Sequence, residues 1–524
     1  MKKKEKPESL MAVHTHTHTH THTLSNLNKY LKTLYSKKEE LATYGIILLI
    51  CIMFCAPLLQ MHIASDTYNF IDLGYFEYPS QYFIKDARII STLVTYLAGV
   101  LNLSYESFII GMEILAVIIS AFSVYYIYKT VRERAKLTNN LQRVLVIMAS
   151  FILVFNCMSL EYLLYAECSI MCLSLLLSII SARIFTSNTT KHRILKSTLI
   201  MILATFCYQG AVNIFLPLSI LFLFIDSNKK TTKELVKIIL MACIVIIVSY
   251  LINVISIYIL NMILGVEQQR IGSGIFSNLS KFAIILKNVV KYTLINNFYL
   301  WPSGITIIFI VISLIMLLFQ KETTREIVQY IVLIVASIGI CVAPIFFMQS
   351  PSIEPRMSMS IGGIIGMSLI YLTTSKQDYN IIKNIVTIIT ILFFTYNAIN
   401  TIQIYTVHIT TNKIDANMGI AIKYKIEEYE QETGNTVTKV GYYRDASHRD
   451  FHYGWNKKYS SFAQRAFDNY YCIIEALNYY CDKNFERVGM DAEIYNKYFK
   501  GKDWQAYSDE QIVFVDDTMY ICTY

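Results

Sequence analysis

The chain has 524 residues, of which 54% are hydrophobic and only 16% are charged, and its mean hydropathy is +0.43. Soluble globular chains carry about 25% charged residues, so this composition argues against an ordinary soluble protein and predicts a polytopic membrane protein. The net charge of +8 does not indicate nucleic-acid binding, because the basic residues lie in short loops between apolar runs.

Residues 1–43 form a polar tail with a basic start but no apolar core or cleavage site, so we do not interpret it as a signal peptide. Histidine alternates with threonine from His14 to His22. Such a tract could bind metal, but nothing orders its imidazoles, and we favour a low-complexity cytoplasmic tail. The stretch "LNKYLKTLYSKKEE" places leucines on one face among lysines, which predicts a short amphipathic helix on the membrane surface.

Eleven apolar runs are candidates for membrane-spanning helices, each of which needs about 20 residues. They lie at roughly residues 44–62, 106–129, 142–159, 167–186, 194–210, 211–226, 237–264, 300–319, 327–348, 357–374 and 383–405. A shorter run at 89–103 contains Thr92, Thr95 and Gly99. If it also crossed, every later basic loop would lie outside, so we expect a juxtamembrane or re-entrant helix in the first outer loop.

Charge gives the expected orientation. Basic loops such as "KTVRERAK" and "SNKKTTKELVK" follow alternate spans, as cytoplasmic loops do. The prediction is a multi-pass plasma-membrane protein with a transmembrane domain at 44–405, a cytoplasmic N-terminus, an extracytoplasmic C-terminus and outer loops at 63–105 and 265–299. No internal repeat is visible, which counts against transporters built from repeats.

Residues 406–524 are predicted to form a small extracytoplasmic α/β domain, with a helix that ends at a turn at 434–435, a strand, a second helix and a terminal hairpin that turns at 516–517. The region is rich in tyrosine. Exposed tyrosines could stack on sugar rings, but we favour the interpretation that they fill a small core. Cys472 and Cys481 could pair only if the helical pattern between them were broken, so we favour two free thiols.

Asp66 follows the first span within about one helical turn, on the expected outer face. The surrounding carboxylates could simply be those of a solvated loop. However, the chain returns to apolar helix after Arg88, which predicts a loop folded onto the membrane surface. A carboxylate in that partly apolar setting has a raised pKa, which suits a general base near neutral pH. Candidate substrate-binding residues nearby are Tyr68, Asp72 and Asp86, and the next outer loop contributes Glu161 and is also flanked by Glu167.

Arg88, Arg270 and Arg356 lie near the outer ends of spans, where the positive-inside rule predicts few cations. Their guanidinium groups could snorkel to lipid headgroups, or they could hold a phosphate. A base and guanidinium groups at one depth suit transfer of a group from a lipid-linked phosphate to a hydroxyl acceptor. No GxGxxG or P-loop pattern for a soluble nucleotide is present.

The stretches "SDTYNFIDLG", "KDARIIS", "ANMGIAIKYKIEEYEQETGNTVTKVG" and "VFVDDTMYICTY" resemble the type II Gtr bacterial glucosyltransferases, a family of the GT-C class of polytopic glycosyltransferases. The resemblance implies a GT-C-like fold, a polyprenyl-phosphate donor of glucose or a related sugar, a cell-surface glycan acceptor, and a separate donor-lipid synthase and flippase. It implies that Asp66 is the catalytic carboxylate. In the second motif the family often has Gly-Arg, whereas this chain has Lys85-Asp86-Ala87-Arg88, so only Arg88 carries over.

We therefore expect a GT-C-type hexosyltransferase that inverts by direct displacement. One alternative is a polymerase or ligase of surface-polysaccharide repeat units, which is also polytopic. Another is a lipid-linked sugar flippase or transporter, which would carry ionisable residues deep inside its spans, where this chain has few apart from Glu113. The sequence leaves the requirement for a divalent metal open, because no DxD motif is present.

Overall fold

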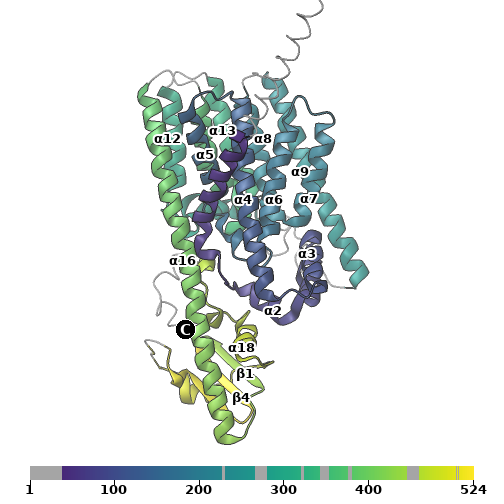
Figure 1. Ribbon diagram of the computed structural model, residues 1–524, viewed down its shortest axis with the longest axis vertical. Helices are drawn as coiled ribbons and strands as arrows, with labels where there is room; N and C mark the ends of the chain where they lie inside the picture. Colours follow the sequence, from purple (N-terminus) through teal and green to yellow (C-terminus); the bar gives the residue numbers. More distant parts are fainter. Residues whose placement is uncertain are drawn as a thin grey trace, which may run out of the picture.

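The computed structural model describes residues 38–226, 231–265, 280–319, 324–342, 353–375, 380–444, 460–502, 504 and 507–523. These residues form a bundle of helices with a small β-sheet beyond one of its ends (Figure 1). The His–Thr repeat, most of the predicted surface helix and Arg270 lie outside the described residues.

Six of the described helices are long and apolar enough to cross a membrane. They are Lys38–Leu58, α4 (Tyr105–Arg134), α6 (Cys168–Phe185), α9 (Thr232–Leu264), α13 (Thr324–Val342) and α16 (Asn380–Thr433). Shorter helices lie between them, namely α5 (Asn140–Val154), α7 (Arg193–Cys207), α8 (Phe215–Phe224) with its preceding turn η4 (Gln209–Ile214), α11 (Phe282–Val289), α12 (Ile305–Phe319), α14 (Met359–Gly362) and α15 (Ile364–Thr374). The chain is thus a helical membrane protein, as its composition predicts.

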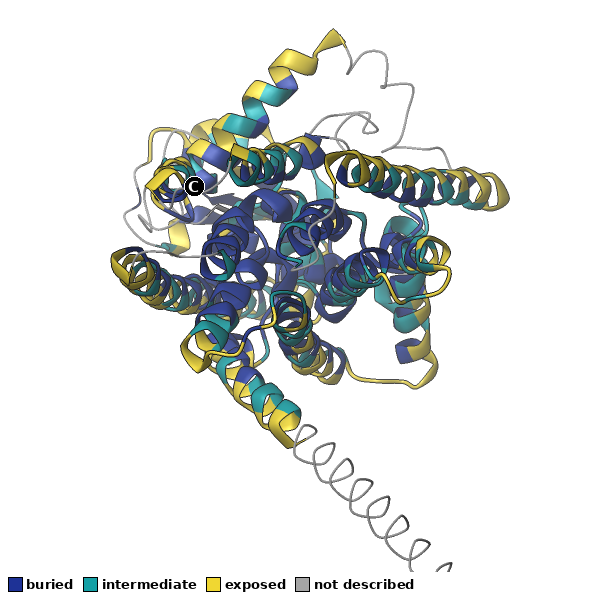
Figure 2. Ribbon diagram, turned by 90° about the horizontal axis from the view of Figure 1, so that it is seen from above, coloured by how far each residue is buried: buried dark blue, intermediate teal, exposed yellow. Residues whose placement is uncertain are grey.

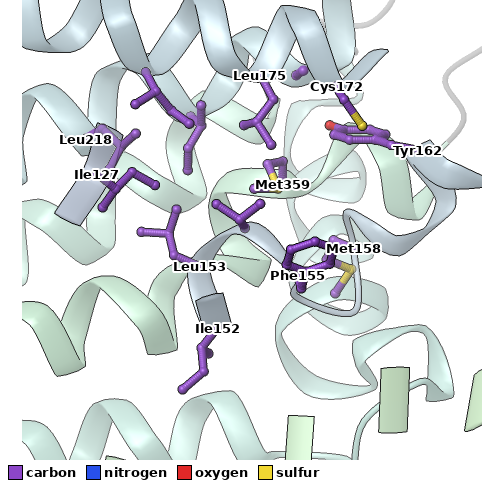
Figure 3. Close-up of a cluster of buried hydrophobic side chains, with 14 of the residues drawn as sticks. Ile127, Ile152, Leu153, Phe155, Met158, Tyr162, Cys172, Leu175, Leu218 and Met359 are labelled. Atoms are coloured by element: carbon purple, nitrogen blue, oxygen red, sulfur yellow. The ribbon is translucent and has the colours of Figure 1, made fainter. Parts of the chain in front are cut away.

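The interior of the bundle is a continuous apolar core. Figure 3 shows part of it, where Ile127 of α4, Leu175 of α6 and Leu218 of α8 are fully or almost fully buried. Helix α15 approaches α5 closely at Gly366. A Cβ atom there would lie 2.7 Å from the backbone nitrogen of Leu153 and 2.8 Å from the carbonyl oxygen of Ala149. Only glycine lets these two helices pack at this distance.

The outer surface of the bundle is also apolar, unlike that of a soluble protein. The exposed side chains of α9 include Leu240, Ile247 and Ile255. Figure 2 shows the same arrangement for the peripheral helices, with buried residues toward the centre and exposed ones outward. Contiguous apolar surface of this extent is typical of a protein that faces lipid.

The segment between the first span and α4 folds against one end of the bundle. It contains α2 (Ser65–Tyr78), the short turn η2 (Pro79–Phe83) and α3 (Ile89–Val100). Helix α3 has 12 residues and is therefore about 18 Å long, too short for a hydrocarbon core of about 30 Å. It packs against α2 and α7 rather than entering the centre of the bundle (Figure 1).

The sheet lies in the C-terminal part of the chain, here residues 406–523. Strands β1 (Lys439–Arg444), β2 (Glu486–Val488), β3 (Ile512–Val515) and β4 (Thr518–Thr523) pair in the order β2-β1-β4-β3. Strand β1 is parallel to β2 and β4, while β3 and β4 are antiparallel. A second apolar core, which includes Ile422 and Ile426 of α16, joins this sheet to α18 (Ile473–Cys481).

The C-terminal part has the predicted helix end and hairpin turn, but its second helix differs from the prediction. Helix α16 ends at Thr433 and Gly434 follows with a φ of +74°, while the β3–β4 hairpin turns at 516–517. The stretch at 461–480 predicts one continuous second helix, but α18 begins only at Ile473, after the turns η10 (Ser460–Ala463) and η11 (Ala466–Asp468). One reason is that the Asp415 carboxylate accepts a hydrogen bond from the backbone N–H of Ala466, at 2.7 Å. Cys472, just before α18, and Cys481, its last residue, are both buried free thiols.

Candidate functional site

A small polar cavity lies where the loops of the bundle meet the C-terminal part. Its charged lining residues are Asp66, Asp86, Arg88, Glu167 and Arg356, and its tyrosines are Tyr78, Tyr82, Tyr165, Tyr208 and Tyr471. Its volume is about 60 Å³, which is room for a few water molecules. Four residues singled out from the sequence, Asp66, Asp86, Arg88 and Arg356, therefore share one cavity although 290 positions separate the first from the last.

Asp66 occupies the first turn of α2, next to the backbone N–H groups at the start of that helix. The partial positive charge of a helix N-terminus favours an ionised carboxylate there. Ala64, the residue before α2, is extended, so α2 begins abruptly after the first span and its first turn lies at the cavity. The Asp66 carboxylate thus lines the cavity from the start of α2.

Arg88 lies between two carboxylates of the cavity. Its Nη1 is 3.4 Å from Oε1 of Glu167 and its Nη2 is 3.5 Å from Oδ2 of Asp86. The guanidinium carbon lies 5.2 Å from the centroid of the Tyr208 ring. Among the described residues, the buried Nε has no hydrogen-bond partner. Arg88 is thus fixed on three sides and retains a donor that a further acceptor could use.

Glu167 contributes the counter-charge from the N-terminus of α6. Burial raises the pKa of its carboxyl group above the usual range, and the Arg88 guanidinium acts in the opposite direction. The sequence singled out Glu167 only as a loop charge that flanks the same loop as Glu161. Its place beside Arg88 depends on two segments 79 residues apart and leaves no local signal.

Arg356 is held by a second carboxylate, Glu161, in the turn η3 (Leu160–Leu163). Its Nη1 lies 2.6 Å from Oε1 of Glu161, and its backbone N–H donates to Oε2 at 3.1 Å. The same guanidinium donates to the Tyr165 hydroxyl at 2.7 Å, and that hydroxyl donates to Glu161 at 2.9 Å. Glu161 is completely buried behind Arg356 and does not line the cavity. Its geometry suits orientation of Arg356 rather than contact with a substrate.

Tyr68 and Asp72 do not line the cavity. The Tyr68 hydroxyl lies 2.8 Å from the hydroxyl of Tyr480, and Oδ1 of Asp72 accepts a hydrogen bond of 2.8 Å from Asn478. Both contacts join α2 to α18. Of the four residues that the sequence suggested as substrate ligands, these two therefore attach the C-terminal part to the helix that carries Asp66.

A further buried polar cluster lies near the cavity. His62, four residues before Asp66, has its Nδ1 atom 3.3 Å from Nε2 of His408 and its Nε2 atom 3.9 Å from Oε2 of Glu113. Burial, with a smaller effect of His408, lowers the pKa of His62 to about 3. Across the described residues, no group of three or more His, Cys, Asp or Glu side chains is arranged to hold a metal ion.

Sequence reasoning missed all five tyrosines of the cavity, and Tyr471 is the one that comes from the C-terminal part. It reaches the cavity from the C-terminal part, because α18 packs along α2. Only the tyrosine-rich composition hinted at such a residue.

These observations define a helical membrane protein with a cavity in which three carboxylates, two guanidinium groups and several phenols converge. No protein-family model, curated protein or solved structure matches the chain. The chemistry of the cavity must therefore be read from its own residues.

Proposed function

We propose that this protein is a membrane glycosyltransferase that moves a sugar from a polyprenyl-phosphate donor to a cell-surface glycan. The observation that carries the proposal is the convergence of Asp66, Arg88 and Arg356 on one cavity. A carboxylate can accept a proton, and two guanidinium groups match the geometry and charge of a phosphate. The resemblance to the type II Gtr glucosyltransferases makes glucose or a related hexose the proposed sugar.

The proposed reaction is a direct displacement with inversion at the anomeric carbon. The acceptor hydroxyl attacks that carbon while Asp66 takes its proton. The bond from the anomeric carbon to the phosphate oxygen breaks, and the lipid phosphate leaves with the electron pair. Arg88 and Arg356 stabilise the negative charge that develops on it. A hexose needs more room than a few waters, so donor binding must widen the cavity.

We further propose eleven membrane crossings, with the N-terminus in the cytoplasm and the C-terminal part on the outer face of the plasma membrane. The six long apolar helices and the five shorter segments α5, α7, η4–α8, α12 and α14–α15 support this number. An odd number puts the two ends on opposite sides, and the basic loops favour an inner N-terminus. The cavity would then lie on the outer face, at the depth of lipid headgroups.

The test compares Asp66→Asn with Glu77→Gln. The first removes the proposed base from the cavity, and the second removes an exposed carboxylate from the same helix outside the cavity. In cells that lack the wild-type gene, we expect Asp66→Asn to reduce sugar decoration of the surface glycan about 10²–10⁴-fold at unchanged protein level. Glu77→Gln should retain decoration. Full decoration by the Asp66→Asn protein would contradict the proposal.

A polymerase or ligase of polysaccharide repeat units is the second candidate, because it would also displace a polyprenyl phosphate and could use the same arginine-lined cavity. A deletion strain separates the two functions. Loss of one side-branch sugar favours the glycosyltransferase, and collapse of glycan chain length favours the polymerase or ligase.

A further inference from the structure

The C-terminal part is joined to α2, the helix that begins at the cavity. Helix α18 packs along α2, and two side-chain hydrogen bonds, Tyr68 to Tyr480 and Asn478 to Asp72, connect them at 2.8 Å each. As a result Tyr471, which lies just before α18, lines the same cavity as Asp66. The C-terminal part is therefore a wall of the candidate site rather than a separate appendage.

Two exposed tyrosines lie where the C-terminal part meets the cavity. Tyr471 lines the cavity and is 43% exposed, and its chain neighbour Tyr470 is 63% exposed. Two consecutive tyrosines with this much exposed surface can offer their rings to a ligand that has an apolar face. The preference for tyrosines that fill a core holds for others in this part, such as Tyr442, which is buried. It does not hold for these two.

Tyr470 is held in place rather than loosely attached. The Arg487 guanidinium donates to the Tyr470 carbonyl oxygen at 2.7 Å, and its central carbon lies 4.6 Å from the centroid of the Tyr470 ring. Arg487 also contacts Glu475, with 3.4 Å between Nη2 and Oε2. The ring is thus supported by a guanidinium whose charge is compensated by a carboxylate, and most of it still faces solvent.

We infer that Tyr470 and Tyr471 form the binding surface for the pyranose rings of the acceptor glycan, and that Tyr471 delivers the reacting sugar to Asp66. The inference rests on the proposed glycosyl transfer and adds where the acceptor binds. The apolar face of a pyranose matches the face of a phenol ring, and Arg487 and Glu475 offer polar groups to the sugar hydroxyls. An anionic membrane surface fits this patch less well, because Arg487 is already paired with Glu475.

The test measures glycan binding directly, without turnover. The probe is the surface glycan of the producing cells, released by mild acid and added to the purified full-length chain in nanodiscs of neutral lipid. We compare the wild type with Tyr470→Ala, Tyr471→Ala and the control Tyr424→Ala. Tyr424 is a 66% exposed tyrosine of α16 that does not line the cavity. Thermal unfolding of each variant shows whether the fold is retained, and Tyr470→Phe shows whether the ring alone is enough.

We expect Tyr470→Ala and Tyr471→Ala each to weaken glycan binding about 3- to 10-fold, and Tyr424→Ala and Tyr470→Phe to bind nearly as the wild type does. Asp66→Asn should bind the glycan while it fails to decorate it, so a failure of the proposed reaction and a failure of the acceptor surface give different results. The inference is overturned if the wild type does not bind the glycan, or if the two alanine variants bind it unchanged. It is also overturned if their only loss is of binding to vesicles of anionic lipid.

Discussion

The ion pair between Glu161 and Arg356 gives a sharp test of how the cavity is supported. Glu161 receives three hydrogen bonds, from the Arg356 guanidinium, the Arg356 backbone N–H and the Tyr165 hydroxyl. In Glu161→Gln one of its two oxygens becomes an NH₂ group that must face a donor. A lost charge-assisted hydrogen bond costs about 1.5–3 kcal/mol, and a donor left without an acceptor costs about 1–3 kcal/mol. Because the Arg356 side chain is 27% exposed and can reach water, we expect a net loss of about 2–4 kcal/mol in the free energy of unfolding.

Substitution of the other partner, Arg356→Gln, should lower the free energy of unfolding further. It leaves the Glu161 carboxylate, which has no exposed side-chain surface, without its counter-charge. The free energy of unfolding of both single variants and of the double variant is measured by titration with a denaturing detergent in mixed micelles. A double-mutant cycle should give a coupling energy of about 2 kcal/mol. A coupling energy below about 0.5 kcal/mol, or a smaller cost for Arg356→Gln than for Glu161→Gln, would refute this account of the pair.

Two further predictions concern stability in the same assay. Gly366→Ala should lower the free energy of unfolding by about 1–3 kcal/mol, because the added methyl group meets the backbone of α5. The control is Gly111→Ala on α4, where a Cβ meets nothing within 4 Å, and it should be neutral or slightly stabilising. Equal effects of the two substitutions would contradict the close packing of α15 on α5. His62 has a pKa of about 3 in the folded protein, against 6.5 for an ordinary imidazole. As the pH falls below 6.5, His62 is protonated in the unfolded chain but not in the folded protein, so the free energy of unfolding decreases. Between pH 7 and pH 5 the wild type should lose about 2 kcal/mol more than His62→Asn, and parallel pH profiles of the two proteins would show that His62 is not held neutral.

The helices of the transmembrane part could largely be predicted from the sequence, because a helix that crosses a bilayer requires a run of apolar residues. The helix predicted at 237–264 is present as Thr232–Leu264, and its extra turn begins with a capping box between Thr231 and Glu234. The helix predicted at 142–159 ends earlier, at Val154. There the Asn156 and Ser159 side chains bind nearby backbone groups and draw the chain into a turn.

The junction between the membrane bundle and the C-terminal part was harder to predict from the sequence. The change in composition near residue 406 predicted a boundary there, but α16 continues through it as one helix. Composition reports the surroundings of a segment, and an unbroken helix can pass from one environment to another when no proline interrupts it.

Only part of the candidate site could be predicted from the sequence. Asp66 and Arg356 could be chosen because each lies at the end of a predicted span, and Arg88 because it immediately precedes the short apolar run at 89–103, where its charge is unusual. Glu161 and Glu167 were noticed in the sequence, but their role as partners of the arginines could not be predicted, because only the fold brings Arg356 and Arg88 to them. Tyr471 depends on the packing of α18 against α2, a contact across about 400 residues of sequence that no local pattern encodes.

The continuity of α16 has a mechanical consequence. A helix of 54 residues is about 81 Å long, and a hydrocarbon core of about 30 Å needs only some 20 of these residues. The remainder acts as a lever about 50 Å long, so a tilt of 5° within the membrane moves its far end by about 4 Å. Packing against the neighbouring helices sets the tilt of such a helix. The height of the C-terminal sheet above the membrane, and the strain on the contacts between α18 and α2, therefore depend on how α16 packs against α5 and α15 within the bundle.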